Sequence, residues 1–303
     1  MNPPLLARAC LTAAALYGTV RPSSSRKASL LTPRAATQDP APSRKFPARM
    51  EAIRVPSGDV RINGVVMVPS GAGPHPTFVL LHGLPGYEKN LDLAQAVRRA
   101  GWSVVTFNYR GSWGSPGDFG FGQSLEDARA VLAFIRHPEN ARRLGIDADR
   151  IAIGGHGMGG WVAAQTATSE PDLLATVTIC ARDMGHIGIA ARSDLAAVAS
   201  VMDDNRETLA GVTGESLAQE LAAHGPAWSF AALIPRLKDK QLLVLYSKDF
   251  AKPDSTTLIA GVKAEGGKSI RSVYIPTDHN WSDRRIALSA LVINGLQSLP
   301  AVW

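Results

Sequence analysis

One segment of the sequence has the pattern of a turn that presents a catalytic nucleophile. The strand-like run Arg150–Gly154, apolar after its first residue, leads into the glycine-rich stretch 155–159 (GHGMG), and a helical pattern follows. In the motif G-x-S-x-G, the strained turn between strand and helix exposes the hydroxyl of the central serine. Here the central residue is Gly157. The sequence therefore predicts the turn without its nucleophile.

Two further segments supply an acid and a base. The apolar run Leu242–Tyr246 is followed by Asp249, and His279 lies in the loop after the strand-like run Ser269–Ile275. A carboxylate can orient a histidine and stabilise its protonated form, and the histidine can accept a proton from a nucleophile. The order of turn, acid and histidine along the chain is the one that this motif requires. Asp254 is a second candidate for the acid.

A second glycine-rich turn, 82–86 (HGLPG), follows the strand-like run Thr77–Leu81. Such a turn can direct a backbone N–H at the oxyanion that develops during acyl transfer. We expect the backbone N–H groups of Leu84 and Met158 to form this oxyanion hole. The alternative is an ordinary turn that ends a strand.

The glycines also allow a different interpretation. Gly155, Gly157 and Gly160 spell G-x-G-x-x-G, and Asp183 follows at about the spacing expected of a dinucleotide site, roughly 20 residues. This pattern would indicate a nucleotide-dependent oxidoreductase. The fingerprint usually opens the sheet, however, whereas several strand-like runs precede it here. We therefore predict that the protein binds no pyridine nucleotide, no other cofactor and no metal.

Strand-like and helix-like runs alternate from about residue 50 onward, which predicts an α/β fold with a mostly parallel sheet and helices on both faces. The capping pattern at Ser124 predicts a helix that begins there. An alanine-rich stretch, residues 182–236, interrupts the alternation and is expected to form a helical cap over the site. The expected strands are Val60–Val68, Thr77–His82, Ser103–Tyr109, Arg150–Gly154, Leu174–Cys180, Gln241–Tyr246 and Ser269–Ile275, and the expected helices are Leu91–Ala100, Ser124–Arg136, Gly160–Thr168 and Ser282–Leu299.

The basic charge of the chain is concentrated at its beginning. Residues 1–50 carry eight Lys or Arg residues and one acid, a formal +7 that leaves −1 for the rest of a chain whose net charge is +6. We expect residues 1–48 to be a disordered leader and residues 49–303 to be the folded domain. The short apolar stretch Ala9–Val20 favours a signal for export, and an organellar or cytoplasmic location is the alternative. A nearly neutral domain does not favour nucleic-acid binding, and no apolar run reaches the length of a membrane span.

From Arg49 to Trp303, the chain resembles α/β-hydrolases of the exported bacterial esterase and prolyl-oligopeptidase-like type. The segment 108–117 (NYRGSWGSPG) adds to this resemblance. The resemblance implies Asp249 as the acid, His279 as the base, and the N–H groups of Leu84 and Met158 as oxyanion donors. The expected substrate is a small ester or acyl compound. Where the family pattern has serine, this sequence has Gly157.

No other residue is a convincing nucleophile. Ser112 and Ser115 lie in a loop, Cys180 ends a strand and is expected to point into the core, and His156 is expected to pack beside the turn. Trp113 and Trp161 are candidates for the wall of an apolar substrate pocket, although each could equally be part of the core. The pattern leaves three interpretations: a hydrolase whose serine was replaced, a non-catalytic binding protein, and a hydrolase in which His279 activates water. The oligomeric state cannot be inferred.

Overall fold

The computed structural model describes residues 32–299. The apolar stretch Ala9–Val20, which was expected to be an export signal, lies outside this part of the chain. Within the described residues, no helix is long and apolar enough to cross a membrane.

The described residues form one eight-stranded sheet in the order β1-β2-β4-β3-β5-β6-β7-β8. The first two strands pair in antiparallel fashion with each other, β2 is also antiparallel to β4, and the remaining neighbours are parallel. The predicted fold class, a mostly parallel sheet in an α/β protein, is therefore confirmed. The strands are β1 (Arg49–Ser57), β2 (Val60–Val68), β3 (His75–Leu81), β4 (Ser103–Phe107), β5 (Ile146–His156), β6 (Thr176–Ile179), β7 (Leu242–Ser247) and β8 (Ile270–Ile275).

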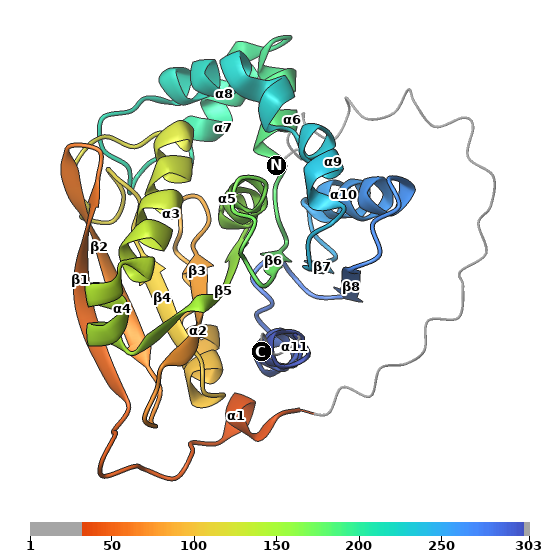
Figure 1. Cartoon of the computed structure of the whole chain (residues 1–303). Helices are drawn as coiled ribbons and strands as arrows, with labels where there is room; N and C mark the ends of the chain where they lie inside the picture. The colour runs from red at the N-terminus through yellow and green to blue at the C-terminus, as the bar shows by residue number, and fades with distance from the viewer. Residues whose placement is uncertain (1–31, 300–303) are drawn as a thin grey trace. The chain divides into compact units, whose positions relative to one another are not determined.

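Helices cover both faces of this sheet (Figure 1). One core layer joins the sheet to α3, α5, α9 and α10, and the other joins it to α2 and α11. The last six residues of β5 are all buried, as expected of a central strand with helices on both sides. The helices outside the cap are α1 (Arg34–Thr37), α2 (Leu91–Arg99), α3 (Phe121–Arg136), α4 (Pro138–Leu144), α5 (Met158–Ala167), α10 (Lys252–Ala264) and α11 (Arg285–Gln297).

The insertion predicted over residues 182–236 is helical and lies between β6 and β7. It contains α6 (Met184–Ala191), α7 (Leu195–Asp203), α8 (Gly214–Trp228) and α9 (Phe230–Leu237). Asp183 joins its two ends, because one carboxylate oxygen accepts the N–H of His186 in α6 and the other accepts the N–H of Phe230 in α9. This cap insertion therefore starts and ends at one fixed point beside the sheet.

Three features of the fold differ from the expectation or add to it. The helix predicted to begin at Ser124 begins at Phe121, and Ser124 lies inside it, buried, with its hydroxyl donating to the Gly120 carbonyl. The expected N-cap is therefore wrong, because a hydroxyl can bond to the carbonyl four residues earlier as readily as it can cap a helix. The edge strand β1 and the helices α4 and α10 were not predicted.

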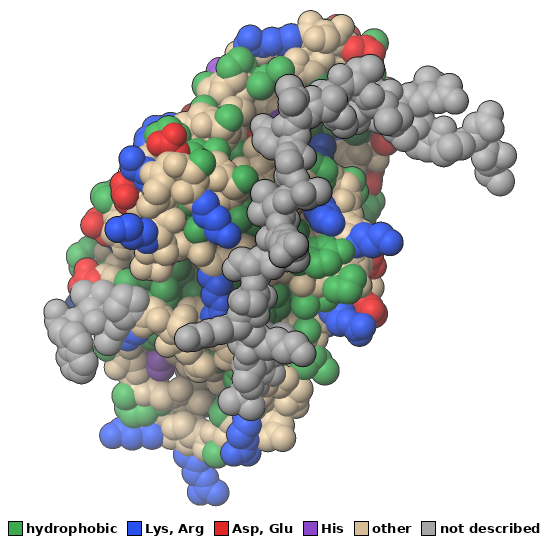
Figure 2. Space-filling view, turned by 90° about the vertical axis from the view of Figure 1, so that its right-hand side faces the viewer, with side chains coloured by type: hydrophobic (Ala, Val, Ile, Leu, Met, Phe, Trp, Pro, Cys, Tyr) green, Lys and Arg blue, Asp and Glu red, His purple; other side chains and the backbone are tan. Residues whose placement is uncertain are grey.

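The packed part of the chain begins before the expected boundary at residue 49. Helix α1 lies within the segment expected to be a leader, and it contacts α2 and α11. Ala36 is buried in the same core layer as these helices, and the Arg99 side chain donates to the Ala35 carbonyl over 2.8 Å. Figure 2 shows one face of the molecule, on which Lys and Arg side chains are scattered among apolar and uncharged surface, some of them beside Asp or Glu side chains.

Candidate active site

The turn after β5 has the backbone of a nucleophile elbow. Gly157 joins the last residue of β5 to the first residue of α5, and its φ of 58° and ψ of −120° lie in a region that L-residues rarely adopt. A Cβ atom placed on the following glycine, Gly159, would lie 2.5 Å from the Leu81 carbonyl oxygen. Glycine at 159 therefore lets α5 approach β3 closely, as the G-x-S-x-G motif requires.

The predicted acid and base are brought together at this turn. His279 Nδ1 lies 2.7 Å from Asp249 Oδ2. A Cβ atom built on Gly157 would lie 3.5 Å from His279 Nε2. The imidazole thus bonds the carboxylate through one nitrogen and presents the other to the position of the missing side chain.

The carboxylate of Asp249 is held by several donors. Its Oδ2 also accepts the Ser247 hydroxyl, and its Oδ1 accepts the N–H of Ala251, each over 3.0 Å. Burial alone would raise the pKa of Asp249, but hydrogen bonds from His279, Cys180 and Ser247 outweigh it and lower the pKa. The acid is therefore ionised at neutral pH and can stabilise a protonated imidazole.

The second candidate acid is used elsewhere. Asp254 Oδ2 accepts a hydrogen bond from the Arg182 side chain over 2.6 Å and another from the backbone N–H of Asp183. Of the two candidate acids, Asp249 is the one bonded to His279.

Two aromatic side chains, His156 and Phe250, also hold the ring of His279 in place. His156 lies beneath it, with the two ring centroids 4.4 Å apart, and its Nε2–H donates to the His279 carbonyl over 2.9 Å. Burial lowers the pKa of His156 to about 3, so this ring is neutral. Phe250 stacks on His279 at 4.5 Å and is itself 63% exposed. The Arg182 guanidinium also lies over the Phe250 ring, 5.4 Å from its centre, so Phe250 lies between the histidine and a positive charge.

Arg285 connects the histidine loop to the segment that follows the HGLPG turn. Its guanidinium donates to the Asn280 carbonyl over 2.7 Å, to Asn90 Oδ1 over 3.0 Å, and to both carboxylate oxygens of Asp92. No motif in the sequence pointed to this residue. An arginine in the first turn of a helix gives no signal when its partners are nearly 200 positions away.

The two predicted oxyanion donors lie on either side of the turn. Met158 is the first residue of α5, so its N–H has no carbonyl acceptor within the helix. The HGLPG turn reaches the same place, because Gly83 Cα would lie 3.9 Å from a Cβ atom on Gly157. Leu84 follows directly. The arrangement suits the oxyanion role predicted for Leu84 and Met158, which remains a prediction.

Ser112 and Ser115 occupy structural positions. Ser112 is fully buried, and its backbone forms a bridge with Leu209 of the cap insertion. The Ser115 hydroxyl donates to the Asn108 carbonyl and accepts the N–H of Asn63. Neither side chain is held as the nucleophile of an elbow would be.

Cys180 lies next to Ser247, whose hydroxyl is bonded to Asp249. Its sulfur is 3.2 Å from both the Ser247 hydroxyl and Trp281 Nε1, and burial raises the pKa of the thiol to about 12. Cys180, Asp249 and His279 place potential metal-ligand atoms within 4.8 Å of one another. A metal here would have to deprotonate this thiol and displace the bond between Asp249 and His279, so the arrangement favours hydrogen bonding over metal binding.

The two tryptophans differ in their surroundings. Trp161 is fully buried, packs against Phe121 and Trp228, and donates its indole N–H to the Trp228 carbonyl. It is therefore part of the core between α5 and the cap insertion. Trp113 is half-buried and donates its indole N–H to the Pro85 carbonyl over 2.8 Å, which places it against the HGLPG turn.

Gly157 and Asp183, which belong to the dinucleotide-like pattern, already form hydrogen bonds within the fold. The Gly157 carbonyl accepts N–H groups of Gly160, Trp161 and Arg182. Both carboxylate oxygens of Asp183 hold the cap insertion, as described above. Asp183 is therefore bonded within the fold rather than presented to a ribose.

The chain resembles hydrolases of known structure. It aligns with an acylaminoacyl peptidase from Pyrococcus horikoshii (TM-score 0.63, 18% identity) over 84% of this chain and 43% of that one, so it spans less than half of that protein. An esterase from Pyrobaculum calidifontis gives a TM-score of 0.63 at 18% identity, over 84% of this chain and 87% of the esterase. EstE1, a thermostable carboxylesterase cloned from a metagenomic library, gives 0.61 at 21% identity, over 87% and 92%.

At these identities the structural likeness shows the fold alone. No curated protein matches the sequence. The sequence model described as "Alpha/beta hydrolase family" matches residues 78–293, which include the elbow, Asp249 and His279. The chain therefore belongs to the alpha/beta hydrolase family.

Proposed function

We propose that this protein binds small ester or acyl compounds at the Gly157 turn and hydrolyses them slowly, without a covalent intermediate. The observation that carries the proposal is the position of His279, bonded to Asp249 on one side and facing the empty side-chain position of Gly157 on the other. A histidine held in this way is an effective general base. Glycine supplies no atom that could be acylated.

In the proposed reaction, water takes the place of the serine hydroxyl. His279 Nε2 accepts a proton from the water while the water oxygen bonds to the acyl carbon of the substrate. The carbonyl oxygen of the substrate then becomes the oxyanion. The N–H groups of Leu84 and Met158 donate to that oxyanion. When the intermediate collapses, the bond to the leaving alkoxide breaks, and the imidazolium returns the proton to it. The products are a carboxylic acid and an alcohol.

A non-catalytic binding protein is the second candidate function, and the same glycine favours it. Loss of a triad member leaves an acceleration of roughly 10³–10⁴-fold over water from the oxyanion hole and binding in a well-studied protease. A residual rate of that size can be too small to matter, while the oxyanion turn would still bind the ligand.

Restoring the nucleophile tests the proposal. Gly157→Ser should turn over short p-nitrophenyl esters much faster than the parent chain, and a fluorophosphonate should label it at residue 157. Gly157→Ala is the matched control, since alanine must adopt the same backbone conformation as serine at this position but has no hydroxyl. It should gain neither activity nor label. A folded Gly157→Ser protein that is no faster than Gly157→Ala would overturn the assignment of Asp249 and His279 as a catalytic pair.

A further inference from the structure

Two residues with unusual backbone conformations meet beside the catalytic pair. Trp281 lies two residues after His279, is fully buried and has a φ of 57°. Cys180, which follows β6, is also fully buried and has a φ of 46°. Non-glycine residues rarely adopt these positive values, and the fold must pay for them elsewhere. The indole N–H of Trp281 donates to the Cys180 sulfur over 3.2 Å, so one hydrogen bond joins the two strained positions.

The direction of the hydrogen bonds around Cys180 follows from the chemistry of its neighbours. An indole nitrogen can only donate, so the Cys180 sulfur is the acceptor for Trp281. Burial raises the pKa of the thiol to about 12, so the thiol keeps its proton. That S–H is left for Ser247 Oγ, 3.2 Å away, or for the carboxylate of Asp249 itself. Ser247 in turn donates to Asp249 Oδ2 over 3.0 Å, and an ionised carboxylate can only accept.

Trp281, Cys180 and Ser247 therefore form a donor chain that runs in one direction and ends on the acid. It ends on the same oxygen that holds the histidine, because Asp249 Oδ2 lies 2.7 Å from His279 Nδ1. Since Trp281 is only two residues from His279, the hydrogen bonds and the backbone close into a ring. The three side chains of the donor chain are fully buried, so water cannot replace any of these donors.

From this ring, we propose that Trp281 and Cys180 are positioning residues, which hold His279 Nδ1 against Asp249 so that Nε2 faces position 157. This inference rests on the proposed function, because the two residues act on the reaction only through His279. Packing in the core explains why Trp281 is buried. It does not require the indole nitrogen to meet a sulfur, whereas a relaxed backbone at either residue would leave buried donors without their acceptors.

Proton NMR on the parent chain tests the positioning without any need for turnover. The proton on His279 Nδ1, identified by its loss in a His279→Gln protein, should resonate far downfield because it is bonded to a carboxylate. Trp281→Phe keeps a buried ring but removes the N–H, and Cys180→Ala removes the thiol. Either change should let the bond from His279 to Asp249 lengthen. The resonance should then move upfield, and its exchange with water should become faster.

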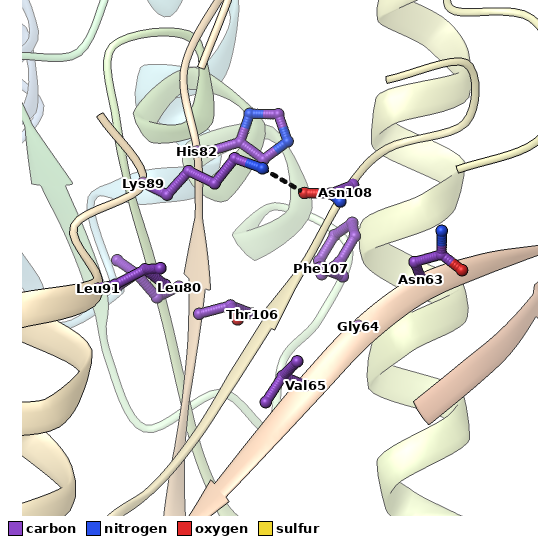
Figure 3. Close-up of a pocket in the computed structure, with 10 residues that line it drawn as sticks. All are labelled: Asn63, Gly64, Val65, Leu80, His82, Lys89, Leu91, Thr106, Phe107 and Asn108. Carbon is purple, nitrogen blue, oxygen red and sulfur yellow. Dashed lines mark hydrogen bonds between the residues drawn. The ribbon is translucent and has the colours of Figure 1, made fainter. Parts of the chain in front are cut away.

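Three further variants separate positioning from packing. Cys180→Ser keeps a group that both accepts and donates, so its resonance should lie closer to the parent's than that of Cys180→Ala. Trp102→Phe changes another buried tryptophan of the same core layer and should not move the resonance. Lys89→Met breaks the hydrogen bond between Lys89 and Asn108, drawn in the pocket of Figure 3, which is no part of the ring. It should also leave the resonance in place.

In the Gly157→Ser background, the same changes should act on kcat rather than on KM. Trp281→Phe or Cys180→Ala should lower kcat about three- to tenfold, the rate equivalent of one hydrogen bond. KM should stay unchanged, because neither side chain is exposed to a substrate. Since both residues act through one donor chain, the double variant should be no slower than the slower single variant.

Four outcomes would each overturn the proposal. These are a resonance that does not move upfield in Trp281→Phe and Cys180→Ala, an equal shift in Trp102→Phe, a Cys180→Ser protein no closer to the parent than Cys180→Ala, and losses of kcat that add in the double variant. An inactive Gly157→Ser protein would instead count against the proposed function. The resonance of the parent chain would still decide whether Trp281 and Cys180 position His279.

Discussion

The Nε2 atom of His279 lies 3.5 Å from the point where a Cβ atom would stand on Gly157. That distance is an ordinary van der Waals contact, so a small side chain would fit there without displacing the histidine. The obstacle to a side chain is the backbone, because φ at Gly157 is 58° and ψ is −120°. Space and strain at this position can therefore be separated by experiment.

We expect Gly157→Ala to lower the free energy of unfolding by about 1–3 kcal/mol, the usual cost of holding a non-glycine residue in such a conformation. Gly122→Ala in α3 is the matched control. Gly122 has no positive φ, and a Cβ atom there would have no neighbour closer than 3.4 Å. This substitution should be neutral or stabilising by about 0.5–1 kcal/mol. Urea unfolding of both proteins checks the difference, and equal midpoints would contradict the strain argument.

Acid should destabilise the protein through its two buried neutral histidines. The pKa of His82 falls to about 4 and that of His156 to about 3, mainly because of burial, whereas both are near 6.5 in an unfolded chain. The unfolded state then binds more protons between these values. The contribution of these two histidines to the free energy of unfolding is fully present above about pH 6.5. It declines as the pH falls and is lost below the folded pKa values.

At pH 5 this linkage amounts to about 2 kcal/mol for each histidine. Urea midpoints measured from pH 7.5 to pH 4.5 should follow the decline. His156→Gln should flatten the slope by about one proton, whatever its effect on stability at pH 7. A slope unchanged by His156→Gln would mean that this ring is already charged in the folded protein.

The start of the folded domain can be located by truncation. A chain that begins at Arg49 lacks α1, and with it the buried Ala36 and the hydrogen bond from Arg99 to Ala35. We expect it to be about 1–2 kcal/mol less stable than a chain that begins at Thr32, from the loss of one charge-assisted hydrogen bond and a small apolar contact. Coincident denaturation midpoints for the two chains would instead support a boundary at residue 49.

The pairing of Asp249 with His279 could be predicted because it depends on chain order. The carboxyl ends of parallel strands meet at one edge of the sheet, so residues after β5, β7 and β8 must come together there. The contributions of Arg285 and Phe250 could not be predicted, since each acts through a partner that only the folded chain brings near.

Strand β1 was missed for a related reason. It is an edge strand in which only Ile53, Val55 and Ser57 are buried, and the residues around them include the charged Arg49, Glu51 and Arg54. It also begins directly after the segment, residues 1–48, that was expected to be a leader. A few alternating apolar residues in such a segment give a weak signal, and the strand becomes evident only from its pairing with β2.

The route of any residual hydrolysis by the parent chain is open to a direct test. If His279 activates water, ester turnover should show no burst, and intact-mass analysis during turnover should find no acyl adduct. His279→Ala should remove the enzymatic rate. Asp249→Asn should lower it, because the carboxylate fixes the tautomer that leaves Nε2 free to accept a proton.

Asp278→Asn is the matched control for these variants. Asp278 is next to His279, but its carboxylate accepts the N–H of Ser282, a role that asparagine can also fill. Its rate should equal that of the parent. In the Gly157→Ser background, His279→Ala should lower kcat by roughly 10²–10⁴-fold, the usual contribution of a general base. An acyl adduct on the parent chain would reveal a nucleophile other than water, and a parent rate unaffected by His279→Ala would leave the site as a place of binding without catalysis.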